Sequence, residues 1–207
     1  MGKHVKLTLL ILLLVIAGSV FSIFYSLKNQ PQNVPISQTS KYPLPVVNAG
    51  TTQTSTVVAP DGKWKLTMEE KKNKEGATYT FSLVDELSNS SKKIFTKTVP
   101  VGTTMALPLN TFSPDDKYFF IKETDSIQTR YFVLLASGQP IFNDSQTVEI
   151  SELFMAKYEE YKITDITGWG GMNLLVVNVD KKEGGTGPSF WFDITNKSFI
   201  RLNDRFN

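Results

Sequence analysis

The chain has 207 residues, a formal net charge of +2 and no cysteine. The absence of cysteine excludes disulfides, thiolate nucleophiles, cysteine-ligated zinc and acylation of a cysteine. Lys3 and Lys6 precede a long uncharged stretch, and the rest of the chain carries 20 basic and 20 acidic residues. A neutral domain without a basic run is unsuited to neutralising phosphates, so we expect no nucleic-acid partner.

The N-terminal stretch from Leu7 to Leu27 contains no charged residue. At about 1.5 Å per residue it gives a helix of about 31 Å, which matches the hydrocarbon core of a membrane. Because the flanking positive charge favours a cytoplasmic N-terminus, we expect residues 1–27 to be a cytoplasmic leader and a single transmembrane signal anchor. The alternative is a signal peptide cleaved near Ala17-Gly18-Ser19, but apolar residues continue past this site.

Residues 28–55 are rich in Gln, Asn, Thr, Ser and Pro. Such a composition buries too little apolar surface to offset the chain entropy lost on folding. We therefore expect a disordered, flexible linker that holds the following domain away from the membrane.

Residues 56–207 show the pattern of short strands joined by turns. The first turn, Ala59 to Trp64, contains Pro60, Asp61 and Gly62, which predicts a positive φ at Gly62 and a backbone hydrogen bond accepted by Asp61. The strand expected after it, 64–68, is followed by a returning strand, 78–84. In that returning strand apolar and small polar residues alternate, as a half-buried strand requires.

The same pattern returns 54 residues later, where Pro114, Asp115 and Asp116 form the turn before the strand 118–122. A weaker third copy begins at 166–171 and includes Trp169. Four strands per unit and a period of fifty-odd residues indicate propeller blades. The predicted fold is therefore all-β: a β-propeller-like array of about three four-stranded antiparallel blades, preceded by one transmembrane helix and the linker.

One segment, 151–161, departs from this pattern. Phe154, Tyr158 and Tyr161 recur at helical spacing, and Ser151 is a suitable N-cap. We expect a short amphipathic helix between the second and third units.

The Pro60-Asp61-Gly62-Lys63 turn, followed by an aromatic residue and an apolar strand, resembles the WD40-like repeat of TolB-type β-propellers. The same repeat occurs in the propeller domains of prolyl-oligopeptidase-family peptidases. The resemblance is good at 59–68 and fair at 113–122, and at 168–177 no Pro-Asp pair remains. It implies a propeller fold over about 56–203, but three units are too few to close a propeller.

Residues suited to catalysis are few. The only histidine is His4, which excludes a Ser-His-Asp triad or a histidine metal site in the folded domain. Neighbouring carboxylates occur at Asp115/Asp116 and at Glu159/Glu160, and we interpret the first pair as turn residues and the second as a polar helix face. A calcium site would need six to eight converging oxygens, for which no recognisable spacing is present. We expect no cofactor and no metal.

The function predicted from the sequence is therefore non-enzymatic: a membrane-anchored, extracytoplasmic binding domain. The TolB-type resemblance implies a protein or peptide partner in the cell envelope. A structural subunit that self-associates or completes a larger propeller is the alternative, and a carboxylate-based hydrolase comes third. Trp169 is the candidate binding residue, although its place before a repeat turn, like that of Val58 and Phe112, predicts a buried side chain.

Overall fold

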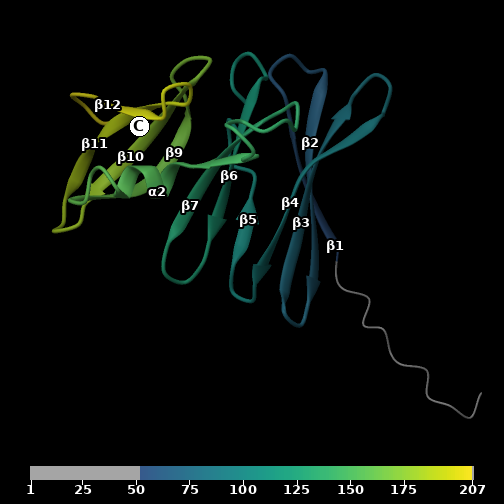
Figure 1. Ribbon diagram of the computed structural model, residues 1–207, viewed down its shortest axis with the longest axis horizontal. Helices are drawn as coiled ribbons and strands as arrows, with labels where there is room; N and C mark the ends of the chain where they lie inside the picture. Colours follow the sequence, from purple (N-terminus) through teal and green to yellow (C-terminus); the bar gives the residue numbers. More distant parts are fainter. Residues whose placement is uncertain (1–51, 207) are drawn as a thin grey trace, which may run out of the picture. The chain divides into compact units, whose positions relative to one another are not determined.

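The computed structural model describes residues 52–206, and all but one of its regular elements are β-strands. The strands form three four-stranded antiparallel sheets, called blades 1, 2 and 3 here, which lie side by side in chain order (Figure 1). Blade 1 contains β1 (Thr52–Val58), β2 (Trp64–Asn73), β3 (Gly76–Asp85) and β4 (Ser91–Pro100). Blade 2 contains β5 (Thr104–Ala106), β6 (Tyr118–Thr124), β7 (Thr129–Leu135) and β8 (Thr147–Glu149). Blade 3 contains β9 (Tyr161–Trp169), β10 (Leu174–Lys181), β11 (Thr186–Asp193) and β12 (Ser198–Arg201).

The predicted all-β fold with three four-stranded antiparallel units is confirmed. The predicted membrane span Leu7–Leu27 lies outside the described residues, and within 52–206 no helix is long and apolar enough to cross a membrane. The linker prediction is wrong at its C-terminal end, because β1 already includes residues 52–55. Its polar residues are ordered through pairing with β2, in a register that places Thr52 opposite Lys71.

The helix found in this region is shorter than the one predicted over 151–161. Helix α2 covers Ile150–Met155, and the chain extends again at Tyr161, the first residue of β9. Ser151 is not the N-cap: its Oγ accepts a hydrogen bond from the Tyr131 N–H of β7 at 3.1 Å. The three aromatic residues spaced like a helical face do cluster, since Phe154, Tyr158 and Tyr161 all pack on Phe190 of β11. The spacing indicated a shared packing partner rather than a continuous helix.

Equivalent backbone hydrogen bonds define the repeat. In each turn, the N–H of the first residue donates a hydrogen bond to the backbone carbonyl of the first residue of the next strand. These bonds run from Ala59 to Trp64 at 2.8 Å, from Ser113 to Tyr118 at 2.9 Å and from Gly170 to Leu174 at 2.8 Å. The third turn is one residue shorter, which explains why no Pro-Asp pair is found there. The residues just before the turns, Val58, Phe112 and Trp169, are therefore structurally equivalent.

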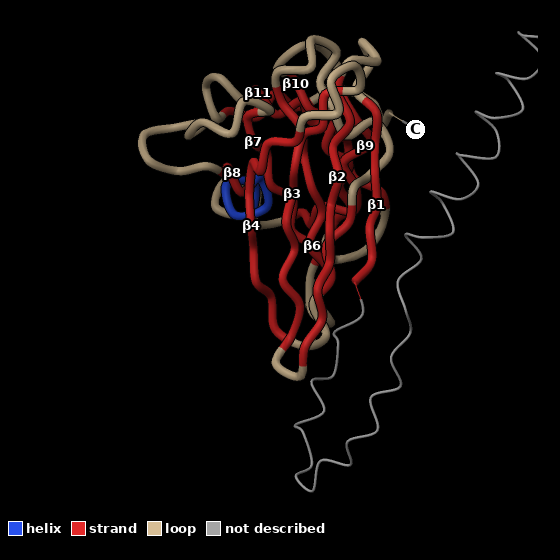
Figure 2. Tube along the Cα trace, turned by 90° about the vertical axis from the view of Figure 1, so that its right-hand side faces the viewer, coloured by secondary structure: helices blue, strands red, loops and turns tan. Residues whose placement is uncertain are grey.

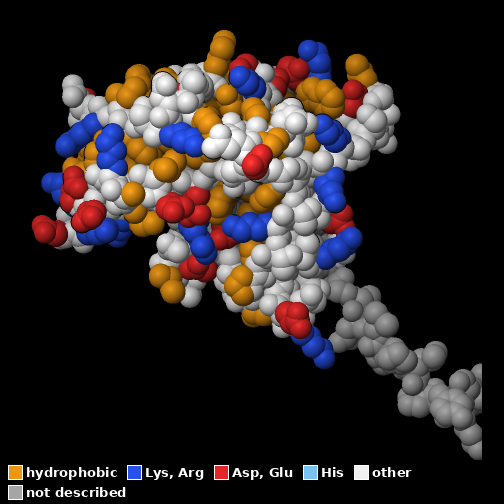
Figure 3. Space-filling view, in the orientation of Figure 1, with side chains coloured by type: hydrophobic (Ala, Val, Ile, Leu, Met, Phe, Trp, Pro, Cys, Tyr) orange, Lys and Arg blue, Asp and Glu red, His pale blue; other side chains and the backbone are white. Residues whose placement is uncertain are grey.

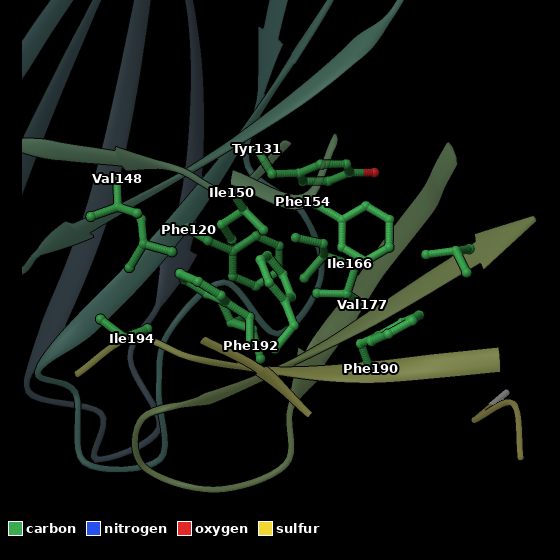
Figure 4. Packing of buried hydrophobic residues seen from close by; sticks show 14 of the residues in the cluster. Phe120, Tyr131, Val148, Ile150, Phe154, Ile166, Val177, Phe190, Phe192 and Ile194 are labelled. Carbon is green, nitrogen blue, oxygen red and sulfur yellow. The ribbon is translucent and has the colours of Figure 1, made fainter. Parts of the chain in front are cut away.

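Blade 2 lies between the other two blades and is buried on both faces. Phe119 and Ile121 of β6 belong to the core shared with blade 1, and Tyr118 and Phe120 belong to the core shared with blade 3. Figure 4 shows the second of these cores, with Phe120 and Phe192 pointing toward one another. A strand buried on both faces reads as a continuous apolar run, as in Tyr118 to Ile121.

The outer face of blade 1 is turned toward the viewer in Figure 2. Cross-strand rows of threonine, serine and charged residues cover it, for example Thr54, Glu69, Thr80 and Thr96. Val58 points to this face, which leaves it 54% exposed, whereas the equivalent Phe112 is buried between blades 1 and 2. The burial of the residue before the turn thus depends on whether a blade precedes it.

The outer face of blade 3 is covered by the chain that follows β12. Phe206 donates its N–H to the Ser189 hydroxyl of β11 at 2.8 Å, and the Arg205 guanidinium donates to the Val179 carbonyl of β10 at 3.0 Å. The Asn178 side-chain amide donates to the carbonyl of Phe206 at 2.8 Å. This segment satisfies polar groups of β10 and β11 on the face where a fourth blade would pack.

Candidate binding groove at the ends of the inner strands

A groove of about 630 Å³ opens where the innermost strands of the three blades end. Blade 1 contributes Val57, Val58 and Pro60, and blade 3 contributes Trp169 together with Phe206 from the C-terminal segment. Between them lies the segment 110–114 of blade 2. The described residues that line the groove include no charged side chain.

The groove lies beside strand edges with unpaired backbone groups. β1 is an edge strand of its sheet and pairs only with β2 among the described residues, and β9 is the corresponding edge strand of blade 3. In blade 2 the edge strand β5 is short and pairs with the far end of β6, and beside the groove the only β-bridge to β6 among the described residues joins Phe112 and Phe119. The groove therefore combines apolar side chains with backbone N–H and C=O groups that a further extended segment can pair with.

Trp169 is held in the groove by contacts from blade 2. Its ring stacks on Tyr118 with centroids 6.4 Å apart and meets Phe120 edge-on at 6.1 Å. Its Nε1–H donates to the carbonyl of Asn110 at 3.0 Å, and the Asn110 side-chain amide donates to the Thr167 carbonyl at 3.3 Å. The side chain packs against the core shared by blades 2 and 3 but is only half-buried, so it is less buried than predicted. One part of the ring packs on blade 2 and the rest faces the groove.

The residues of the repeat turns occupy neighbouring positions. Pro60 and Pro114 line the groove. Gly62 has a φ of 72° and Asp61 Oδ1 accepts the Lys63 N–H at 2.8 Å, which is the geometry expected from the sequence. That hydrogen bond is the main cause of the lowered pKa of Asp61.

The second turn contains two carboxylates, Asp115 and Asp116, where the first contains only Asp61. Asp115 Oδ1 accepts a hydrogen bond from the Ser113 hydroxyl at 2.7 Å, as a turn residue does. Asp116 takes the place of Gly62 and has a positive φ of 58°. Its side chain lies beside Asp61 of the first turn, and burial, followed by the negative charge of Asp61, raises the pKa of Asp116. The spacing along the sequence did not predict this pairing across two blades.

Other acidic residues considered from the sequence do not converge. Asp125 accepts the backbone N–H groups of Ile127 and Gln128 and pairs with Arg130 at 2.7 Å. Asp144 lies in an exposed loop. Within residues 52–206 no three Asp, Glu, His or Cys side chains come together in a way that could hold a metal ion.

The face in Figure 3 shows lysine and arginine side chains interspersed with carboxylates and hydrophobic residues. Charges of both signs are mixed over this face, as the 20 basic and 20 acidic residues after Lys6 suggest. Such a surface lacks the single-sign stripe along which a phosphate backbone binds.

We expect Asp116→Asn to raise the melting temperature at neutral pH. An acid whose pKa is raised in the folded state favours folding in its protonated form, and this contribution is lost as the pH rises through the folded-state pKa. The asparagine side chain stays neutral and tolerates the positive φ. Thermal unfolding measured from acid to neutral pH should show a gain that grows with pH. A gain of equal size at all pH values would contradict the role of the Asp61–Asp116 contact.

Proteins similar to this chain are found only among the solved structures. No known protein family matches the chain, and no curated protein matches it. A structure from a study of two prolyl endopeptidases shares 14% identity and a TM-score of 0.42, covering 75% of this chain and 22% of that one. Oligopeptidase B from Leishmania major shares 11% identity and a TM-score of 0.33, covering 75% of this chain and 27% of that one. The chain thus spans about a quarter of the length of these peptidases.

Proposed function

We propose that this protein is a non-enzymatic binding module, anchored by one transmembrane helix, whose blades lie outside the cytoplasm and bind a protein or peptide partner of the cell envelope. The blades correspond to WD40-like repeats of the TolB type, on the evidence of the Pro60-Asp61-Gly62 turn and its equivalent at Pro114. The observation that carries the proposal is the groove, in which uncharged side chains lie beside the free edge of β1.

The chemistry of the groove favours an extended, uncharged segment of a partner. A bound strand would pair with the unsatisfied backbone groups of β1, and the apolar lining would accept its side chains. Charged side chains would lose hydration without gaining a partner among the lining residues. A hydrolytic function has less support, because Asp115 is engaged in its own turn.

The faces at the two ends of the row favour binding over assembly into a larger propeller. A further blade needs an apolar face to pack on, yet the outer face of blade 1 carries threonine and charged residues. The outer face of blade 3 is already covered by residues 202–206.

The membrane anchor is testable by itself. Membranes washed with alkaline carbonate should retain the protein, because a charge-free stretch of spanning length at Leu7–Leu27 inserts stably. Mass spectrometry should find the original N-terminus. A mature chain that begins near Val20 would contradict the anchor and support a cleaved signal peptide.

The groove is tested by placing a charge in it. Val58 lines the groove and is 54% exposed, so Val58→Glu should leave the fold intact. Peptides selected from a random display library on the full-length chain should be uncharged and extended. Val58→Glu should lower the affinity of the protein for these peptides about tenfold or more. Val101→Glu is the matched control, because Val101 is 72% exposed and does not line the groove.

Two results would contradict this proposal. Selected peptides that bind wild type and Val58→Glu equally would place binding elsewhere. Stable self-association of the full-length chain in a mild detergent, measured by sedimentation, would instead support the structural subunit.

A further inference from the structure

A second cavity, which we call the Trp64 cleft, lies between blades 1 and 2 and has a volume of about 450 Å³. Trp64 and Leu83 of blade 1 line it opposite Phe112 of blade 2. Asp116 lines it as well, together with three serines and Lys92. An apolar cavity of this size with a few polar groups has the properties of a small-molecule site.

At the equivalent place between blades 2 and 3 the corresponding aromatic side chain is buried. Tyr118 takes the place of Trp64 there, and it is 8% exposed because its ring stacks on Trp169. Trp64 remains 38% exposed, although it begins its strand in the same way. Side chains of the repeat therefore close the joint between blades 2 and 3. They leave the joint between blades 1 and 2 open.

The polar end of the cleft holds the Asp116 carboxylate, which has no cationic partner among the described residues. Asp116 Oδ1 is buried and has no hydrogen-bond partner, and the second carboxylate, Asp61, lies beside it. Lys63 pairs with Asp61 at 3.1 Å, and the amine of Lys92 donates to the Ser137 carbonyl at 2.7 Å. Within residues 52–206 no lysine or arginine forms an ion pair with Asp116.

An unpaired carboxylate at the edge of an apolar cavity is costly, and a bound cation would remove this cost. We propose that the Trp64 cleft binds a small organic cation, namely a protonated amine on an apolar body. The ammonium group would pair with the Asp116 carboxylate, and the apolar body would lie against the Trp64 ring between Leu83 and Phe112. The face of an indole also attracts a cation nearby, which adds to the same preference.

Other ligand classes fit less well. An anion would be repelled by Asp116 and Asp61, and the Lys92 amine that lines the cleft already donates to the Ser137 carbonyl. A neutral apolar molecule could occupy the cleft but would leave the Asp116 carboxylate without a partner. The cleft and the groove are different cavities that share Phe112 as a lining residue, and the ligand class of the cleft does not depend on the proposed peptide function.

The test uses phenethylammonium as the probe and phenethyl alcohol as its neutral isostere. Affinities for the full-length chain in a non-ionic detergent are measured by ligand-observed NMR. We expect saturable binding of the ammonium and binding of the alcohol that is weaker by about tenfold or more, as a hydrogen bond to a charged group provides. Asp116→Asn should abolish the difference between the two probes.

Asp144→Asn is the matched control, because it makes the same change of charge at an exposed position outside the cleft. It should keep the full preference for the ammonium. Trp64→Leu should weaken both probes, since both use the ring. The proposal is overturned if the two probes bind wild type equally, if Asp116→Asn keeps the preference, or if the ammonium shows no saturable binding.

Discussion

Replacing Gly76 by alanine should lower the free energy of unfolding by about 3 kcal/mol or more. Gly76 begins β3 with a φ of 153°, and an added Cβ would lie 2.0 Å from the backbone oxygen of Val99 in β4. Backbone oxygen cannot rotate away as a flexible side chain can, so β3 and β4 would have to separate at this point. Urea unfolding of the full-length chain measures the loss.

Gly102 provides the control for this substitution. Its φ of 88° is also unfavourable for alanine, but no atom lies within 4 Å of an added Cβ. Gly102→Ala should therefore cost only the backbone strain, about 1 kcal/mol. Equal losses at the two sites would show that the contact with Val99 is relieved by a small shift, and the predicted clash would then be wrong.

The sequence carries more information about the blades than strand positions alone. Residues 78–84 alternate between polar and apolar because blade 1 has one face in solvent, and its polar members Thr78, Thr80 and Ser82 lie on the outer face. Residues 118–121 are apolar throughout because blade 2 is buried on both faces. The contrast between these two patterns identifies which blade lies at an end and which lies in the middle.

The predicted helix is longer than the observed one because its apolar spacing has another cause. Phe154, Tyr158 and Tyr161 share one packing partner, Phe190, and an apolar cluster produces helical spacing whether or not the backbone stays helical. No pattern within a single segment separates these cases, because the partner comes from β11, about thirty residues further along the chain.

The candidate sites were predictable only in part. Trp169 was the candidate binding residue and lines the groove, whereas Pro60 was predicted only as a turn residue and lines it as well. The Trp64 cleft was missed, because it depends on the turn of one blade meeting the turn of the next. Asp116 is an ordinary turn residue in the sequence, and its environment changes only when folding brings Asp61 beside it.

Trp169→Ala should lower the free energy of unfolding by about 2–4 kcal/mol, somewhat less than a fully buried tryptophan would cost. The loss comes from the stacking on Tyr118 and Phe120 and from the hydrogen bond to the Asn110 carbonyl. Trp169→Phe keeps much of the ring packing and removes the N–H donor, so it should cost about 1 kcal/mol. Chemical denaturation of both variants and of wild type measures the contribution of the ring packing and that of the N–H hydrogen bond.

The same pair of variants separates the structural role of Trp169 from its role in the groove. If the exposed part of the ring contacts a bound peptide, Trp169→Phe should weaken peptides selected on wild type while most of the stability remains. If Trp169 acts only by packing blade 3 on blade 2, the phenylalanine variant should bind these peptides as wild type does. An alanine variant with unchanged stability would refute the packing role, because the ring would then contribute nothing to the joint between the blades.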